Sequence, residues 1–418
     1  MRNDPRHQSG LSTPFLTGWF YPVPQVCYKP FGHEISWEGV RTLNDITPGL
    51  SSPLIDAFEH QDEFFASAFD VLQSGVAQHA FPAASAAITD RGKLVALKAL
   101  GHFTYDRIPS AEVVPSTLFD LASLTKVVAT TPMAMLLYER GLLDLDAPVS
   151  AIVPEFISDA GKDPRRREVT LRMLLAHSSG LPAYEKLFLK ARTRDELLRA
   201  AFSMPLSADP GSRAEYSDIG FFILGVALER LGDESLDRFC QREIFAPLAM
   251  PSTAFNPPES IRSRIPPTQD DRSFRNRIIQ GEVQDENASV LGGVAPHAGL
   301  FSTARDLAKF AHSMLGGGHP VFRPETVSLF TRRESTPDGT TRALGWDTPS
   351  SPSQSGKYFS PRSVGHLGYT GTSLWIDPVR QLSIVLLTNR TWPDCSNWAI
   401  KQVRPRFHDA VFEALHLE

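Results

Sequence analysis

One serine and one lysine stand three residues apart in the segment from 119 to 126, Phe-Asp-Leu-Ala-Ser-Leu-Thr-Lys. The apolar stretch that follows predicts a helix beginning near Ser123, with Ser123 and Lys126 on one face about one turn apart. A serine in the first turn lies among free backbone N–H groups, so a nucleophile beside an amine is one interpretation. The alternative is a helix N-terminus next to a solvated lysine, because a single Ser-x-x-Lys match also arises by chance.

Two later segments carry groups that could serve the same reaction. Tyr216-Ser217-Asp218 is the only Tyr-x-Asp or Tyr-x-Asn sequence in the chain, and the segment from Gly365 to Gly371 precedes a predicted strand. A serine hydroxyl needs a base when it attacks a carbonyl, and Lys126 and Tyr216 are the candidates. Their reference pKa values, about 10.4 and about 10, must be shifted by burial or charge for either group to act near neutrality.

The ordered set of Ser123-x-x-Lys126, Tyr216-x-Asp218 and His366-x-Gly368 resembles the class C β-lactamase and penicillin-binding-protein-like serine hydrolases, including family VIII type esterases. The likeness covers residues 60 to 415, and the segments 174–181 and 299–303 within this range support it further. It implies a β-lactamase/transpeptidase-like fold and a reaction without a metal or an organic cofactor.

Residue by residue, the resemblance implies that Ser123 is acylated and that Lys126 and Tyr216 share proton transfer. Asp218 stands where an asparagine usually holds the lysine and the substrate amide. The backbone N–H groups of Ser123 and Tyr369 would form the oxyanion hole. His366 and Gly368 would support substrate binding.

Two departures from the β-lactamase pattern bear on the substrate. His366-Leu367-Gly368 replaces Lys-Thr-Gly, which exchanges a permanent cation for a titrating one and weakens recognition of a β-lactam or peptide carboxylate. Asp218 adds a negative charge that would keep Lys126 protonated and shift proton transfer toward Tyr216. An alternative register aligns Tyr369-Thr370-Gly371 with the same motif and places Thr372 at the oxyanion hole.

Structural roles are the alternative for each of these side chains. Tyr216 and Asp218 could be a loop tyrosine and a helix N-cap, and His366 a hydrogen-bonding residue at a strand edge. The spacing of His177 and His297 does not support a metal site, so loop packing is expected for both. Five further residues are expected in the cleft wall or the core: Asp285, Glu286 and Asn287 as loop residues that could line the cleft, and Trp346 and Trp375 as core or cleft wall.

The elements that must position these groups follow from periodicity and turn residues. Strands are predicted at 84–89 and 94–100, joined by a turn at 90–93, and again at 373–377 and 382–389. Helices are predicted over 55–78, 119–140, 170–177, 193–203, 219–231, 303–315 and 396–415. Because strands occupy both ends of this series, we expect an α/β (α+β) fold: one antiparallel sheet flanked by helices, with an inserted, mainly helical subdomain.

We therefore expect an irregular extension over residues 1–55, a sheet subdomain from 56–130 plus 300–418, and a helical subdomain over 131–299. With 418 residues, 42% of them hydrophobic, the chain can bury a sizeable core. A net charge of -5 gives no general reason to expect nucleic acid as a partner, and no apolar run is long enough to span a membrane. Three widely spaced cysteines argue against a disulfide framework or a cysteine zinc site.

The first function hypothesis is a carboxylesterase-type or broad acyl hydrolase that forms an acyl-enzyme on Ser123 with a small ester, amide or β-lactam. The alternatives are a β-lactamase or D-amino-acid peptidase, and a catalytically weak protein that binds peptidoglycan peptides. Residues 1–20 lack the apolar core of a signal peptide, so a cytoplasmic location is expected, or a periplasmic one if the natural start differs. The oligomeric state is left open.

Overall fold

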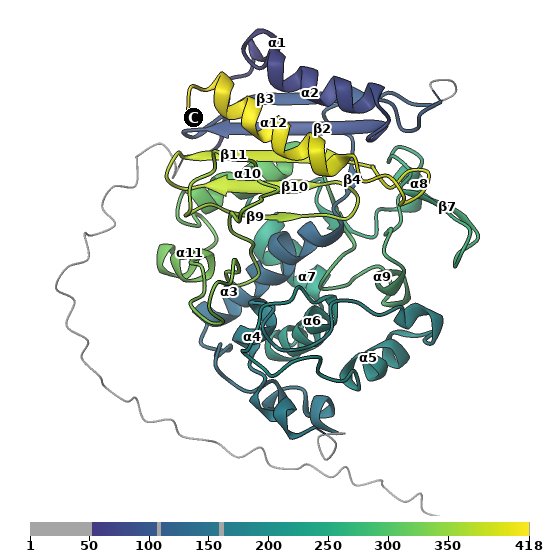
Figure 1. Ribbon diagram of the computed structural model, residues 1–418, viewed down its shortest axis with the longest axis vertical. Coiled ribbons are helices and arrows are strands. Elements are labelled where there is room, and N and C mark those ends of the chain that lie inside the picture. Colours follow the sequence, from purple (N-terminus) through teal and green to yellow (C-terminus); the bar gives the residue numbers. More distant parts are fainter. Residues whose placement is uncertain (1–51, 107–109, 159–162, 418) are drawn as a thin grey trace, which may run out of the picture. The chain divides into compact units, whose positions relative to one another are not determined.

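A six-stranded sheet forms the centre of the protein, with strand order β1-β3-β2-β11-β10-β9 (Figure 1). The computed structural model describes residues 52–106, 110–158 and 163–417, which belong to one compact unit, Ile46–Glu418. The strands of this sheet are β1 (Ile55–Asp56), β2 (Ala83–Asp90), β3 (Lys93–Gly101), β9 (Val364–Leu367), β10 (Ser373–Asp377) and β11 (Leu382–Thr388). Neighbouring strands are antiparallel except for β1 with β3. The expected sheet, shared by the first and last parts of the chain, is confirmed.

Helices cover both faces of this sheet (Figure 1). On one face, α2 (Ala66–Ala77) packs beside α12 (Ile400–Ala414), and their phenylalanines Phe69, Phe407 and Phe412 form an apolar core with the sheet. On the other face lies α10 (Ala304–Leu315), whose first turn is capped by Thr303, since the Thr303 side chain accepts the Asp306 N–H. The helix predicted over 303–315 is confirmed, whereas the helix predicted from residue 55 begins only with α1 (Gln61–Phe64), because Ile55 lies in β1.

The middle of the chain is mainly helical. It contains α4 (Leu171–Leu175), α5 (Arg194–Phe202), α6 (Asp218–Gly232), α7 (Leu236–Cys240), α8 (Glu259–Arg262) and α9 (Glu286–Val290), while α11 (Pro324–Thr331) follows α10. Three short strands missed by the sequence reasoning also occur here: β5 (Ala254–Phe255), β6 (Gln269–Asp271) and β7 (Arg277–Ile279). Two or three residues are too few to give a readable alternation. The subdomain boundaries at residues 130 and 299 stay a prediction.

The segment that carries Ser123 differs from the prediction of one helix over 119–140. Its first two residues form β4 (Phe119–Asp120), which pairs with β8 (Leu300–Ser302). A 3₁₀ turn follows at Ala122–Leu124, then a π-helical turn at Lys126–Thr130, and the regular helix α3 covers only Thr131–Glu139. The strand pairing overrides the local helical pattern, because Phe119 and Asp120 find backbone partners from residues far along the chain.

Further expectations concerned the first 55 residues, the cysteines and membrane-spanning segments. Apart from its last four residues, the extension expected over residues 1–55 lies outside the described residues, as does Cys27. Cys240 and Cys395 are free thiols. Within the described ranges, no helix has both the length and the apolar character that crossing a membrane requires.

Candidate active site

The turn that presents Ser123 is held in an unusual backbone conformation. Ala122, directly before the serine, has a φ of 47°, in the left-handed region that alanine rarely adopts. The Asp120 carboxylate accepts the Ala122 N–H at 2.8 Å, and the Thr125 hydroxyl donates to the Ala122 carbonyl at 2.7 Å. These contacts fix the turn on both sides of the strained residue and so determine where the Ser123 hydroxyl points.

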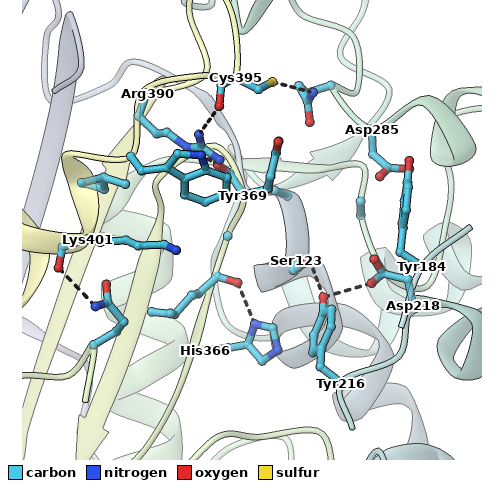
Figure 2. Close-up of a pocket in the computed structure, with 18 of the residues that line it drawn as sticks. Ser123, Tyr184, Tyr216, Asp218, Asp285, His366, Tyr369, Arg390, Cys395 and Lys401 are labelled. Atoms are coloured by element: carbon cyan, nitrogen blue, oxygen red, sulfur yellow. Dashed lines mark hydrogen bonds between the residues drawn. The ribbon is translucent and has the colours of Figure 1, made fainter. Parts of the chain in front are cut away.

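Ser123, Tyr216 and Asp218 lie together in one cluster (Figure 2). Lys126 belongs to the same cluster through its contacts with Ser123 and Asp218. Ser123 Oγ lies 2.8 Å from the Tyr216 hydroxyl and accepts a hydrogen bond from Lys126 Nζ at 3.1 Å. The Tyr216 hydroxyl donates to Asp218 Oδ1 at 2.9 Å. Because the only phenolic hydrogen is used in that bond, the Ser123 hydroxyl is the donor in its contact with Tyr216.

Lys126 is completely buried, and its ammonium group has three acceptors. Nζ donates to Ser123 Oγ, to Asp218 Oδ1 at 2.7 Å and to the His297 carbonyl at 3.1 Å. Burial lowers the pKa of Lys126 below its usual value, although the Asp218 charge acts in the opposite direction. The expected effect of Asp218 on the lysine is therefore present, but burial outweighs it.

The same surroundings shift the pKa of Tyr216 upward, whereas that of Lys126 is shifted downward. Burial and the adjacent Asp218 carboxylate raise the pKa of Tyr216 well above its usual value, because both disfavour a second negative charge. A free phenolate at Tyr216 is thus disfavoured, and the expected shift of proton transfer toward Tyr216 stays a prediction. Tyr216 can still pass a proton onward, since its own hydrogen is already directed at Asp218.

The loop before α6 fixes Tyr216 and Asp218 relative to Ser123. Ser217, not Asp218, is the N-cap of α6, because the Ser217 side chain accepts the Gly220 N–H. The Ser217 N–H in turn donates to His177 Nδ1 at 3.0 Å. The His177 ring packs 4.8 Å from the Tyr216 ring and 5.0 Å from the Phe221 ring. His177 therefore positions the tyrosine, a role that its place in segment 174–181 did not reveal.

A second histidine supports the lysine from the other side. The His297 carbonyl accepts a hydrogen bond from Lys126 Nζ. The ring nitrogen Nε2 of His297 lies 2.9 Å from Asp285 Oδ1. Asp285 also caps α9 by accepting the Ala288 N–H at 2.7 Å. Burial raises the pKa of Asp285, but the His297 interaction and the Ala288 N–H outweigh it, so this pKa is lowered overall. His177 and His297 are both buried, as expected from packing, yet both also contact the cluster.

The third predicted motif lies at the end of β9, next to Ser123. His366 is 4% exposed, and its Nδ1–H donates to the Leu367 carbonyl at 2.8 Å. Burial lowers the pKa of His366 well below its usual value, and the positive charges of Lys126 and Arg342 lower it further. His366 is therefore neutral at neutral pH, which corrects the expectation that it replaces lysine as a titrating cation.

Gly368 lies against the turn that carries the serine. A Cβ added at Gly368 would overlap Thr372 Oγ1 and come within 2.5 Å of the Leu121 carbonyl. Thr372 itself is fully buried, and its hydroxyl donates to the Leu121 carbonyl at 2.9 Å. Thr372 is absent from the lining of the cavity described below, whereas Tyr369 belongs to it; the register of the motif stays a prediction. Tyr369, by contrast, is partly exposed, and its backbone N–H has no acceptor in the described residues.

These residues line a cavity of about 850 Å³. Ser123, Tyr216, Asp218, His366, Gly368 and Tyr369 all face it, together with Asp285 and Glu286, while Asn287 is buried and bonds instead to the segment 185–188. Trp346 and Trp375 belong to the core. Lining residues not anticipated from the sequence include Tyr184, Arg342, Arg390, Trp398, Lys401 and Arg404. In the parts of the chain that the structure describes, no three His, Cys, Asp or Glu side chains gather as metal ligands do.

Comparison with known proteins adds sequence relatives. A family model described as Beta-lactamase matches residues 68–398. A putative D-alanyl-D-alanine carboxypeptidase of Escherichia coli (strain K12) is 34% identical over 307 residues, which are 66% of this chain and 69% of the relative. An N-acetylmuramyl-L-alanine amidase of Bacillus subtilis (strain 168) is 33% identical over 345 residues, which are 74% of this chain and 77% of the relative.

Solved structures share the fold at lower identity. EstCE1, described as a hydrolase with promiscuous acyltransferase activity, is 21% identical with a TM-score of 0.69, over 84% of this chain and 99% of that one. A class C β-lactamase from Rhodobacter sphaeroides is 23% identical with a TM-score of 0.63, again over 84% and 99%. The β-lactamase/transpeptidase-like fold expected from the sequence is confirmed.

Proposed function

Because this chain belongs to the β-lactamase family, we propose that it is a serine hydrolase whose Ser123 forms an acyl-enzyme with small carboxylic esters. The observation that carries the proposal is the contact of Ser123 Oγ with both Tyr216 and Lys126 at the wall of an open cavity. A hydroxyl with a proton acceptor on one side and a proton donor on the other is equipped for nucleophilic acyl transfer.

In the first step, Ser123 Oγ attacks the substrate carbonyl and its proton moves to the Tyr216 oxygen. The phenolic hydrogen of Tyr216 moves at the same time to Asp218 Oδ1, along the existing 2.9 Å hydrogen bond. Tyr216 therefore relays the proton without becoming a free phenolate, which agrees with its raised pKa. Asp218 is the final acceptor of this relay.

In the second step, the tetrahedral intermediate collapses and the leaving group takes a proton from Lys126, whose pKa is lowered by burial. Protonated Asp218, whose Oδ1 lies 2.7 Å from Lys126 Nζ, returns its proton to the lysine. Water then attacks the acyl-enzyme by the same relay, and Ser123 Oγ recovers a proton from Lys126 as the acid leaves. At the end of the cycle Ser123, Tyr216, Asp218 and Lys126 have returned to their starting protonation states.

The developing oxyanion would be bound by the backbone N–H groups of Ser123 and Tyr369. Ser123 lies in the first turn of a helical segment, where N–H groups lack intrahelical acceptors. The Tyr369 N–H follows Gly368 at the end of β9 and has no acceptor in the described part of the chain. Two such donors, fixed before the reaction, stabilise charge that appears only in the transition state.

One feature favours esters over β-lactams. His366 is neutral and buried where the β-lactamase pattern has a lysine, so the strand offers no cation to a β-lactam carboxylate.

A second candidate is the hydrolysis of an amide in a cell-wall peptide. The names of the relatives favour it, since one is called a D-alanyl-D-alanine carboxypeptidase and another an N-acetylmuramyl-L-alanine amidase. Protonation by Lys126 would serve an amine leaving group as well as an alkoxide.

The proposal is tested by labelling and turnover of the purified protein. A fluorophosphonate probe should label the parent stoichiometrically and leave Ser123→Ala unlabelled, and only the parent should hydrolyse 4-nitrophenyl butyrate. A fluorescent penicillin and a D-alanyl-D-alanine peptide, tested in parallel, separate β-lactams and amides from esters.

Thr130→Ser is a matched control, because Thr130 is a buried hydroxyl residue of the same segment that bonds to Pro296 rather than to the cluster. This variant should keep both the label and the turnover. Absence of both label and hydrolysis in the parent would sink the enzyme proposal and leave a protein that only binds such substrates.

A further inference from the structure

Arg390 lies two residues beyond the end of β11 and lines the cavity. It is almost completely buried, with 1% of its surface exposed. Figure 2 shows its side chain beside Tyr369, whose backbone N–H is one of the two proposed oxyanion donors. Because the proposed proton transfers use no atom of Arg390, its place beside this donor needs another explanation.

The segment from Gly368 to Gly371, which contains Tyr369, is a β-turn. The Gly371 N–H closes it by donating to the Gly368 carbonyl at 3.0 Å, so Tyr369 and Thr370 are its central residues. Turns of types I and II differ chiefly in the direction of the peptide group between the central residues. When that peptide group is fixed, the turn loses its main internal freedom and the Tyr369 N–H keeps one direction.

Arg390 holds that peptide group. Its Nε donates to the Tyr369 carbonyl, which belongs to the central peptide, at 2.7 Å. The backbone N–H of Arg390 donates to the following carbonyl, that of Thr370, at 3.0 Å. The turn also packs on the aliphatic part of the arginine, because a Cβ added at Gly371 would lie 2.7 Å from Arg390 Cγ. Both hydrogen bonds and this close packing bind the turn to Arg390.

The guanidinium group is itself held by the loop that leads to α12. Its Nη1 donates to the carbonyls of Cys395 and Asn397, each at 3.1 Å, and Figure 2 marks the first of these bonds. The guanidinium carbon also lies 4.3 Å from the ring centres of both Tyr369 and Trp398. Because a guanidinium group is planar and rigid, these contacts fix the direction of its Nε–H.

The stability of the fold does not by itself explain an arginine at this position. In the part of the chain that the structure describes, its hydrogen-bond partners are backbone carbonyls and its ring contacts are neutral. Burial lowers the pKa of Arg390 below its usual value, because burial disfavours the charged form. A buried cation with neutral partners costs free energy, whereas a fixed donor beside Tyr369 serves the reaction.

We infer that Arg390 is a positioning residue, which fixes the turn from Gly368 to Gly371 so that the Tyr369 N–H meets the carbonyl oxygen of the substrate. It acts through the backbone of Tyr369 and needs no contact with the reacting carbonyl. A donor that is fixed before the reaction binds the oxyanion better than a donor that must first be ordered. This inference rests on the proposed hydrolase function, since the oxyanion forms only during acyl transfer.

The test changes the atom that the oxyanion hole binds. 4-Nitrophenyl butyrate is compared with the thionoester in which sulfur replaces its carbonyl oxygen, because sulfur is a weak acceptor and gains little from the two donors. Arg390→Gln should lower the ester-to-thionoester ratio of kcat/KM about tenfold, chiefly through kcat of the ester. Arg390→Lys, which keeps the charge but not the planar group, should lower it about threefold. A purely structural role would slow both substrates equally and leave the ratio unchanged.

Arg380→Gln is the matched control at the other end of β11. Arg380 also donates its Nε to a backbone carbonyl, that of Leu417 at 3.2 Å, and lies near an aromatic ring, that of Phe412, but it is absent from the cavity lining. This variant should keep the ratio within about twofold of the parent. Arg390→Lys keeps the test valid if Arg390→Gln fails to fold. Ratios within about twofold of the parent in each folded Arg390 variant would overturn the inference.

Hydrogen exchange separates this inference from the proposed function. Exchange of the Gly371 N–H, followed by mass spectrometry on a peptide that covers residues 365–372, should become about tenfold faster in Arg390→Gln and stay unchanged in Arg380→Gln. Faster exchange supports a turn fixed by Arg390 even if no ester is hydrolysed, and then only the hydrolase proposal fails. Unchanged exchange in Arg390→Gln refutes the inference whether or not Ser123 is labelled.

Discussion

Asp218 contacts both proton-transfer partners of Ser123, so a change at this one carboxylate acts on Tyr216 and Lys126 together. An asparagine at this position could still accept a hydrogen bond from the lysine through its amide oxygen. It could not take up the phenolic proton, because an amide is not a base near neutral pH. The proposed relay thus depends on the acid and not on the hydrogen bond.

Asp218→Asn is predicted to lower kcat for 4-nitrophenyl butyrate by about 10²-fold to 10⁴-fold, which is the range for the loss of a general base. Ester turnover and fluorophosphonate labelling rates over pH 5–9 provide the measurement. Melting temperature and circular dichroism serve as controls for folding. Activity within threefold of the parent would show that Asp218 only holds the lysine and that the proton leaves Ser123 by another path.

The residues that carry the reacting groups could be predicted from the sequence, whereas the residues that orient them could not. Ser123, Lys126 and Tyr216 belong to short patterns with a chemical reason for their spacing, and the structure brings them together. His177 acts through a single nitrogen on the backbone of residue 217, a contact that no local pattern encodes. Arg390 likewise acts through a single nitrogen on the Tyr369 carbonyl, 21 residues away in the sequence.

At the scale of elements, the end of β9 and the turn carrying Ser123 are joined by side-chain hydroxyls. Thr370 donates to the Asp120 carbonyl at 2.8 Å, and Thr372 donates to the Leu121 carbonyl at 2.9 Å. Gly368 lies in this joint with no room for a side chain. The distance between the two proposed oxyanion donors therefore depends on how closely these two segments approach.

Gly368→Ala is predicted to separate the two segments by at least about 0.5 Å, because the added Cβ would lie 2.5 Å from the Leu121 carbonyl oxygen and real Cβ contacts stay above 3.0 Å. The variant should lower stability by about 1–3 kcal/mol and lower kcat more than it raises KM. Urea unfolding and steady-state ester kinetics measure these effects. Gly220→Ala in α6 is the control, because a Cβ there meets its nearest atom at an ordinary 3.4 Å and alanine favours helix. Equal kcat and KM values in the two variants would contradict a functional role for the close approach of the two segments at Gly368.

The elements that were predicted correctly are those specified by their own residues. The turn at 90–93 and the alternation around it determine the β2–β3 hairpin, and Thr303 determines where α10 begins. The nucleophile segment was predicted less well, because β4 exists only through its pairing with β8, more than 175 residues later. Its local sequence favours helix, and distant backbone partners decide otherwise.

At the scale of the whole molecule, one buried acid makes the stability of the fold depend on pH. Asp120 is 2% exposed and accepts the backbone N–H groups of Ala122 and Gln284. Burial raises its pKa from 3.8 to about 6, despite these two hydrogen bonds. Since the folded state holds this proton more tightly, the contribution is favourable below pH 4 and is lost as the pH rises through about 6.

Asp120→Asn is predicted to remove this dependence. The difference in unfolding free energy between the parent and the variant should shift by about 3 kcal/mol, against the parent, between pH 3.5 and pH 7. Urea denaturation of both proteins at half-unit pH intervals measures it, and the difference cancels the other titrating groups. A difference that stays constant over this range would mean that Asp120 is not destabilised in its ionised form.

The pairing of β2 with β11 has a consequence for how the protein is made. Residues 84–90 bind residues 382–388 across the middle of the sheet. A ribosome therefore releases Ser123, Lys126 and Tyr216 long before it releases the strand that completes the sheet and before Tyr369 at the end of β9. A nascent chain that has reached only Tyr216 carries its nucleophile but not its proposed oxyanion hole, so hydrolysis is expected only after β9 and β11 have left the ribosome.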